Sequence, residues 1–168
     1  MNYRVWCRTM LTVYKFLGVI TASLDKCINR MACSAAAESG NQAEKIIGYT
    51  ENKIDLINLK VIIEQIFLKI PKEHSELLML RYVDNMQNKD IAELKNWGMR
   101  TYFRKLSRAL TAFENEVETV ACEHKDIFDK LLGQKWIEMA FDEHLKKVDS
   151  MVCGDSSSLE KLVRCPIF

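Results

Sequence analysis

A cluster of basic side chains lies between Lys95 and Phe113. The segment contains five basic residues and no acidic residue, and the bases are Lys95, Arg100, Arg104, Lys105 and Arg108. Arginine can donate two parallel hydrogen bonds to a guanine edge, and arginine and lysine both neutralise phosphate groups. Arg100 and Arg104 are four residues apart, so they share one face if the segment is helical. The spacing therefore favours contact with a polyanion, with guanidinium groups available to read base edges.

The other reactive side chains form no pattern typical of catalysis or metal binding. The three histidines, His74, His124 and His144, are scattered, and no serine or cysteine is placed beside them as an activated nucleophile. The six cysteines include no CxxC pair, and Cys122-x-His124 offers too few ligands for a zinc site. We therefore expect a protein that is not an enzyme, with no catalytic residues, no metal and no cofactor.

Long helices are expected to position the basic segment. The chain has 168 residues with only six glycines and two prolines, and the alternating runs typical of strands do not persist. These features predict an all-α fold. Apolar residues at helical spacing predict helices at about residues 3–33, 41–69, 71–83, 87–95, 99–120, 126–132 and 134–148.

The first predicted helix carries a heptad seam. Its apolar residues alternate spacings of four and three, at Trp6, Met10, Val13, Leu17, Ile20, Leu24, Cys27 and Met31. A seam of this kind packs against another helix. Two alternatives follow, because the seam either packs on the rest of the same chain or joins a second helix, in a homodimer or in another partner.

The second predicted helix carries an apolar stripe that we expect to face the core. The stripe consists of Ile47, Ile54, Ile57, Val61 and Leu68. Near the end of the helix it is widened by Ile46, Ile62, Ile63, Ile66 and Phe67. The C-terminal half of this helix should therefore be the more deeply buried half. The first two helices are expected to form an antiparallel hairpin.

Two short polar breaks divide residues 70–113 into three helical segments. Pro71 suits a helix start because its φ is fixed, and Asp84 with Asn85 supplies turn-forming residues. Residues 96–98 supply the second break. Inward-facing positions are expected at Leu77, Leu78, Leu80, Tyr82, Val83, Ile91, Ala92, Leu94, Tyr102, Leu106, Ala109, Leu110 and Phe113. This pattern predicts a helix-turn-helix whose last helix enters a DNA major groove.

Several short motifs follow one another along the same residues. They are Ile70-Pro71, Leu77-Leu78-x-Leu80-Arg81-Tyr82, Asp90-Ile91-Ala92-Glu93, and Thr101 with Leu106 and Arg108-Ala109-Leu110. In this order and without a gap, they resemble region 4 of the bacterial sigma-70 class of sigma factors, over about a quarter of the chain. The resemblance implies binding to double-stranded DNA and docking on core RNA polymerase. Residues 1–69 show no polymerase-binding or DNA-melting motif, so the chain is more similar to small sigma-like regulators of phage and low-GC bacteria.

Three residues depart from the pattern of that family. Lys95 stands where the family has an apolar residue, and its stem can cover the core while its amine reaches water. Asn96 replaces a turn glycine, which is tolerable because asparagine can adopt the left-handed region. Gly98 replaces a serine or threonine cap and remains an acceptable helix N-cap.

The helical spacing and the resemblance define an expected DNA-contacting set. With Tyr102 and Leu106 buried, Arg100 and Arg104 point outward near the end of the helix that reads bases. Phe103 either contacts a thymine methyl group or packs on the fold. The complete set is Gln87, Asn88, Lys89, Arg100, Thr101, Phe103, Arg104, Lys105, Ser107 and Arg108. Of these, phosphate contacts are expected from Lys105, Arg108, Gln87, Asn88 and Lys89. The alternatives are a solvated basic surface, or a module that binds RNA polymerase or another protein without reading DNA.

The net charge of +1 hides an uneven distribution. Residues 114–155 contain eleven acidic and five basic side chains, a local charge of −6. We divide the chain into an N-terminal helical hairpin, the helix-turn-helix, C-terminal acidic helices and a mobile tail, at 1–69, 70–120, 121–150 and 151–168. The apolar run at 10–20 is interrupted by Lys15 and is too short to cross a bilayer. With reduced thiols as the default, we expect a cytoplasmic protein that makes no membrane contact.

Overall fold

The described part of the chain is helical. A computed structural model describes residues 3–33, 39–132, 137–139 and 142. Its elements are α1 (Tyr3–Cys33), α2 (Ser39–Lys69), α3 (Lys72–Leu78), the π-helical turn η1 (Met79–Val83), α4 (Asn88–Leu94), α5 (Met99–Glu123) and α6 (Lys125–Leu132). These residues contain no strand, so the predicted all-α class is confirmed. The break expected near Gly133, most of the helix expected at 134–148, and the tail lie outside the described residues.

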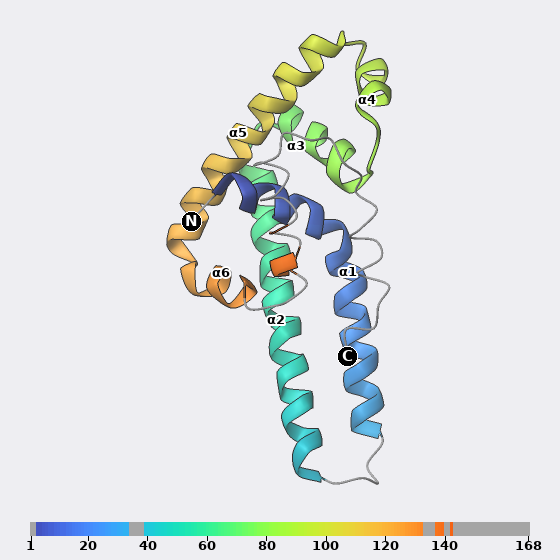
Figure 1. Ribbon diagram of the computed structural model, residues 1–168, viewed down its shortest axis with the longest axis vertical. Coiled ribbons are helices and arrows are strands. Elements are labelled where there is room, and N and C mark those ends of the chain that lie inside the picture. Colours follow the sequence, from blue (N-terminus) through green and yellow to red (C-terminus); the bar gives the residue numbers. More distant parts are fainter. Residues whose placement is uncertain (1–2, 34–38, 133–136, 140–141, 143–168) are drawn as a thin grey trace.

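α1 and α2 form an antiparallel pair whose far end extends beyond the other helices (Figure 1). Each is 31 residues long. The Lys53 ammonium lies 2.5 Å from the Asp25 carboxylate and ties the two helices together in this extension. The N-terminal part of α1 bends across α2 (Figure 1). The Thr9 and Thr12 hydroxyls there donate to carbonyls four residues earlier, at 2.9 and 2.8 Å, a contact that often bends helices.

The heptad seam of α1 is used within the chain. Its fully buried members are Trp6, Met10, Val13, Leu17 and Leu24, and Ile20 is partly buried. The Trp6 ring meets the edge of Phe128 of α6 with the ring centroids 5.3 Å apart. The structure therefore matches the alternative of packing within one chain. These five residues are not on the surface, where a homodimer would need them, whereas Cys27 and Met31 at the end of the seam are partly exposed.

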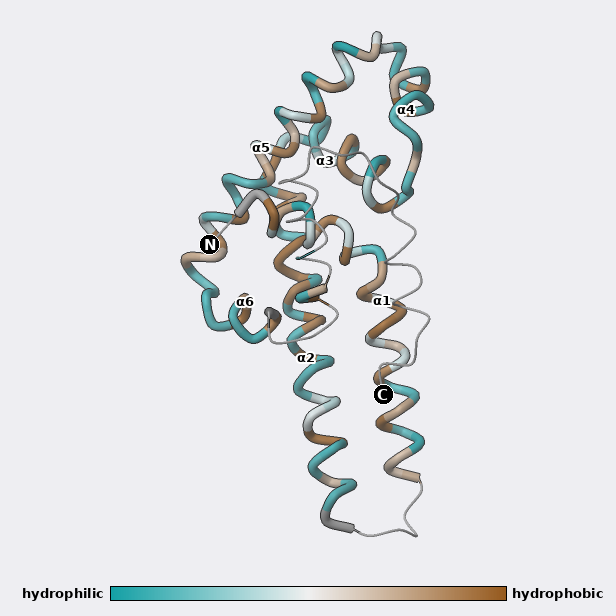
Figure 2. The backbone as a smooth tube through the Cα atoms, viewed as in Figure 1, coloured by the Kyte–Doolittle hydropathy of each residue, from teal (hydrophilic) through white to brown (hydrophobic). Residues whose placement is uncertain are grey.

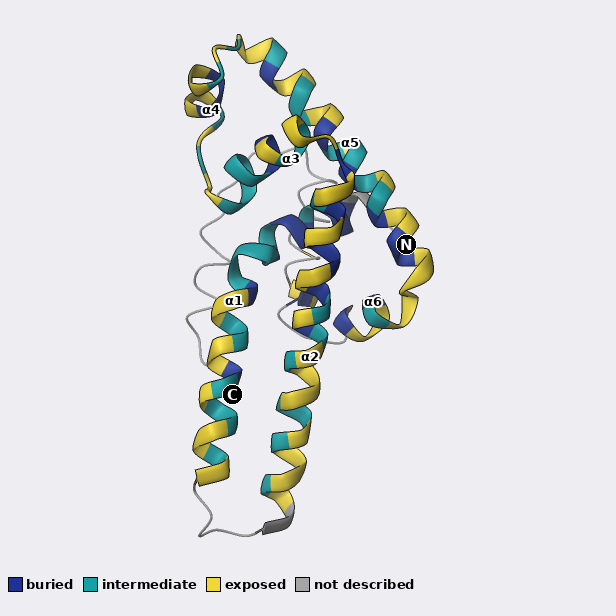
Figure 3. Ribbon diagram, turned by 180° about the vertical axis from the view of Figure 1, so that it is seen from behind, coloured by how far each residue is buried: buried dark blue, intermediate teal, exposed yellow. Residues whose placement is uncertain are grey.

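The face of α2 that is buried differs from the predicted stripe. The buried apolar residues of α2 are Leu56, Leu59, Ile62, Ile63 and Ile66, and Ile70 directly after the helix is buried as well. The stripe residues Ile47, Ile54, Ile57, Val61 and Leu68 are all exposed, so the prediction that they face the core was wrong. The C-terminal half is the more deeply buried half, as expected, and hydrophobic residues concentrate there (Figure 2). α1, α3, α5 and α6 contact α2, and the exposure of the stripe residues shows that these helices do not cover them (Figure 3).

α5 connects the basic segment to the core. It packs against α1, α2 and α3, and its buried residues include Ala109, Phe113, Val117 and Val120. The Phe113 ring lies 5.4 Å from that of Phe67, centroid to centroid. One cluster of buried residues runs through α1, α2, α3, α4, α5 and α6. The C-terminal part of α5 is therefore anchored in the core, and this anchors the helix whose N-terminal part carries the basic residues.

Candidate nucleic-acid interface

α4 and the N-terminal end of α5 lie at one extremity of the molecule, opposite the tip of the α1–α2 pair (Figure 1). Ile91 and Ala92 bury the inner face of α4, and Tyr102 is fully buried on α5. The Tyr102 hydroxyl donates a hydrogen bond of 2.8 Å to Oδ1 of Asn88, at the start of α4. Burial raises the pKa of Tyr102, so the hydroxyl keeps the proton that it donates at neutral pH. Apolar packing and this hydrogen bond thus fix α4 against α5.

The turn between α4 and α5 depends on one left-handed residue. Asn96 has φ of 52°, as its side-chain type allows, and its N–H donates to the Glu93 carbonyl at 3.0 Å. The Trp97 N–H donates to the Ala92 carbonyl at 2.8 Å. Gly98 is extended, with φ of −66° and ψ of 150°, and directly precedes α5. These contacts satisfy the backbone at the end of α4 and set the direction of α5.

Ile91 and Ala92 define the inward face of α4. Their position around the helix decides whether Leu94 and Lys95 face inward or outward. At 100° per residue, this face includes Lys95 and leaves Leu94 more than a quarter-turn away. Leu94 is accordingly exposed, and the prediction that it faces inward was wrong. The half-buried Lys95 extends along α3, where its amine lies 3.1 Å from the Glu76 carboxylate. The lysine that breaks the apolar pattern therefore links α4 to α3.

Arg100, Arg104 and Arg108 form an exposed basic row along α5. Successive members are one helical turn apart, about 6 Å along the axis. Within the described residues none of the three takes part in an ion pair, and the ion pairs nearby involve Lys95 and Lys105 instead. Ser107 is exposed on the same face, and Thr101 is half buried at its edge. The row therefore presents three guanidinium groups to an incoming ligand.

Lys105 does not belong to this row. Its amine pairs with the Glu73 carboxylate of α3 and lies 4.3 Å from the centroid of the Trp97 ring. The hydrogen bond from Lys105 is the main cause that lowers the pKa of Glu73. Lys105 is 100° around the helix from Arg104, on the side that faces α3. The expectation that it contacts phosphate conflicts with this placement, because its charge is already paired within the chain.

The residues at the start of α4 also include both exposed side chains and one that stabilises the fold. Gln87 precedes the first turn with an extended backbone, and both Gln87 and Lys89 are exposed. Asn88 is half buried because its amide oxygen accepts the hydrogen bond from Tyr102. Gln87 and Lys89 are therefore free to meet a ligand, whereas Asn88 has a structural role.

An apolar pair adjoins the basic row. Met99 and Phe103 are one turn apart on α5 and are 39% and 50% exposed. The Phe103 ring also meets the Tyr102 ring edge-on, with centroids 5.2 Å apart. Sequence reasoning included Phe103 in the site but missed Met99, although the spacing of four residues from Phe103 was a usable signal.

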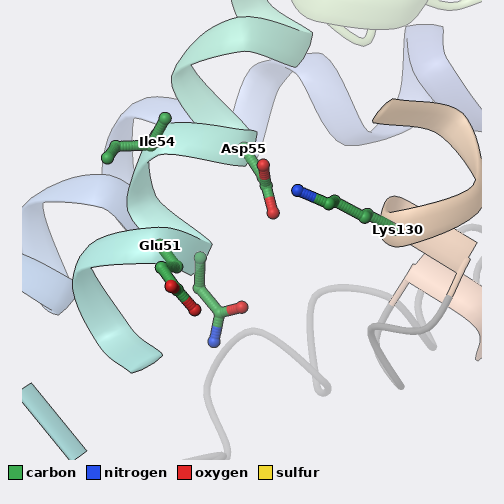
Figure 4. Close-up of a pocket in the computed structure, with 5 residues that line it drawn as sticks. Glu51, Ile54, Asp55 and Lys130 are labelled. Atoms are coloured by element: carbon green, nitrogen blue, oxygen red, sulfur yellow. The ribbon is translucent and has the colours of Figure 1, made fainter. Parts of the chain in front are cut away.

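The described residues also form a cavity away from this surface. It lies between α2 and α6 and is lined by Glu51, Asn52, Ile54, Asp55 and Lys130. Asp55 and Lys130 point toward one another across it, and Ile54 points away (Figure 4). Its lining includes no serine, cysteine or histidine. No group of three or more potential metal ligands occurs in the described part of the chain.

None of the described helices has an apolar run long enough to cross a membrane. Comparison of the chain with protein-family models, with curated proteins and with solved structures gave no match.

Proposed function

We propose that this chain binds double-stranded DNA through the N-terminal half of α5 and acts in transcription control. The single observation that carries the proposal is the exposed, unpaired row of Arg100, Arg104 and Arg108 on a helix fixed at the extremity of the fold. A helix in the major groove contacts base edges with residues near its N-terminus. Arg100 and Arg104 are therefore the base-reading residues, and Arg108, Lys89 and Gln87 contact phosphates.

The packing of the α4–α5 unit supports this proposal, because different basic residues hold the unit together and face the solvent. The lysines that hold the unit together, Lys95 and Lys105, pair with carboxylates of α3. The arginines, which can form two hydrogen bonds with one guanine, face outward. α6 packs at the opposite end of α5 and leaves this face open (Figure 1). The resemblance to sigma region 4 agrees with the same assignment.

The proposal is tested by the affinity for fluorescein-labelled duplex DNA, measured by anisotropy. The variant Arg100→Ala/Arg104→Ala removes both base-reading groups. The matched control Lys26→Ala/Arg30→Ala removes two exposed charges with the same spacing from α1. Each base contact is worth about 1–3 kcal/mol, so the first variant should bind a preferred site roughly 30-fold more weakly or worse. Far-UV circular dichroism should be unchanged in both.

Equal weakening by the two double variants would reduce the effect to net charge and would contradict the proposal. So would unchanged binding by Arg100→Ala/Arg104→Ala, because the proposal assigns base reading to these two side chains.

A second function is favoured by Met99 and Phe103. Exposed apolar side chains beside a charged face are typical of protein contacts. In this alternative the unit docks on RNA polymerase or another protein and does not itself read DNA. Phe103→Ala should then abolish capture of purified core polymerase, whereas Arg100→Ala/Arg104→Ala should not. Trp97 is unsuited to this test because it is half buried beneath Lys105.

A further inference from the structure

Two carboxylates of α3 pair with the two lysines of the basic segment between Lys95 and Phe113. Glu73 and Glu76 are three residues apart, so they are neighbours on one face of α3. Glu73 pairs with the Lys105 ammonium, and the Glu76 carboxylate lies 3.1 Å from the Lys95 amine. In the described part of the chain, no ion pair involves an arginine of the segment. α3 therefore neutralises the lysines and leaves the arginines of the basic row exposed.

Two different contacts hold the Lys105 ammonium against the fold. It pairs with the Glu73 carboxylate, and it lies 4.3 Å from the centroid of the Trp97 ring. Only 29% of the Lys105 side chain is exposed. An exposed ion pair by itself orders a lysine weakly, whereas a carboxylate and an aromatic face together attract the same ammonium. The amine is therefore kept on the α3 side of α5.

Lys105 is nevertheless close to the surface that we assign to DNA. It is three residues from Arg108 and four from Thr101, so both are its neighbours on the helix. Its four-carbon stem is flexible, and the ammonium carries three rotatable donors. Once released from Glu73, the amine needs only a side-chain movement to approach the phosphates that Arg108 contacts. Glu73 therefore decides whether the interface gains another phosphate contact.

Lysine and arginine contribute differently to DNA recognition. A lysine ammonium is a point charge that any phosphate satisfies, whereas an arginine guanidinium can form two hydrogen bonds with one guanine edge. Phosphate contacts strengthen binding to every sequence, and base contacts strengthen binding to the preferred site alone. An interface that neutralises its lysine and exposes its arginines thus gains specificity at the cost of nonspecific affinity.

We propose that Glu73 is a specificity-determining residue of the α5 interface, because it withholds the Lys105 ammonium from DNA phosphates. This inference rests on the proposed function, in which DNA lies against the basic row. Glu73 acts through Lys105 and needs no contact with the DNA. Loss of the Glu73 charge should therefore add one phosphate contact, tighten binding to every sequence and reduce the discrimination between sequences.

The test is the salt dependence of binding by Glu73→Gln, measured by anisotropy between roughly 50 and 200 mM salt. The probe is a fluorescein-labelled short duplex of randomised sequence. One added phosphate contact should steepen the slope of log affinity against log salt concentration by about 0.9, so the fall in affinity over this range should grow by a factor of roughly 3 to 4. Glu116→Gln is the matched control, because Glu116 pairs with Lys69 at 3.9 Å on the part of α5 outside the interface. It removes the same charge and should leave the slope unchanged.

A second pair of variants tests whether the effect passes through Lys105. In the Lys105→Ala chain, Glu73→Gln should not change the slope, because no ammonium is left to release. In a selection from randomised duplex DNA, Glu73→Gln should enrich the preferred motif less than the wild-type chain does. Far-UV circular dichroism should be the same for all of these chains.

An unchanged slope in Glu73→Gln overturns the inference and leaves the proposed function standing. Equal steepening by Glu116→Gln, or steepening that persists in the Lys105→Ala chain, reduces the effect to net charge and also overturns it. Wild-type enrichment by Glu73→Gln overturns the role in specificity. A wild-type chain that binds no duplex overturns the proposed function, and this inference with it.

Discussion

Arg108 and Lys105 are three residues apart on α5, and the proposed DNA interface includes Arg108 but not Lys105. Arg108 is exposed on the basic row, whereas Lys105 is paired with Glu73 and lies over Trp97. Each phosphate contact contributes about −0.9 to the slope of log affinity against log salt concentration. Arg108→Ala should therefore make the slope shallower by about 0.9, and Lys105→Ala should leave it almost unchanged.

The slope is measured by anisotropy with duplex DNA between roughly 50 and 200 mM salt. Affinity falls as salt rises over this fourfold range. Loss of one phosphate contact should make that fall smaller by a factor of roughly 3 to 4, because the slope changes by about 0.9. That difference is well above the error of a titration series. Each variant removes one positive charge, so each serves as the control for the other. A Lys105→Ala slope as shallow as that of Arg108→Ala would refute the assignment of Lys105 to the fold.

Two predictions concern the fold that holds the interface. Asn96 has φ of 52°, so Asn96→Val should lower the free energy of unfolding by about 1–3 kcal/mol, and Asn96→Gly should not lower it. Urea denaturation measures both, and a stable Asn96→Val variant would count against the left-handed turn. Burial raises the pKa of the Cys7 thiol from 9.0 to about 12, so at pH 8 iodoacetamide should label the exposed Cys33 and Cys122 in the native chain and spare Cys7. The Cys7 thiol ionises at lower pH in the unfolded chain than in the native one, so the free energy of unfolding should also fall as pH rises from 9 toward 12. This fall should be less steep in Cys7→Ala.

Local patterns predicted the elements of this fold well. The heptad seam of α1 identified a helix over 3–33 and five residues that the fold buries, although the seam alone left open whether its partner is in the same chain. Asn85 and Asn96 were expected in turns, and both have positive φ. The predicted second helix began two residues late, because Ser39 and Gly40 were assigned to the loop. The π-helical turn at 79–83 had no recognisable signal in the sequence.

Long-range partners could not be predicted in the same way. Periodicity shows which residues of α2 share a face, but α2 has two apolar faces, and the positions of α1 and α5 decide which one is buried. Lys105 fitted a phosphate contact by its spacing, whereas its partner Glu73 lies 32 residues away in the sequence. Leu94 was assigned inward from its apolar character, but the short α4 buries only Ile91 and Ala92. In each case the tertiary arrangement decides between options that are locally equivalent.

The central claim is that α5 reads DNA sequence. The measurement that tests it most directly is selection of bound sequences from randomised duplex DNA at about 150 mM salt, where weak nonspecific contacts are screened. The purified chain should be run with and without core RNA polymerase, in parallel with Arg100→Ala/Arg104→Ala. We predict an enriched motif that the double variant fails to select. No enrichment in either condition, or the same motif from the double variant, would contradict the account.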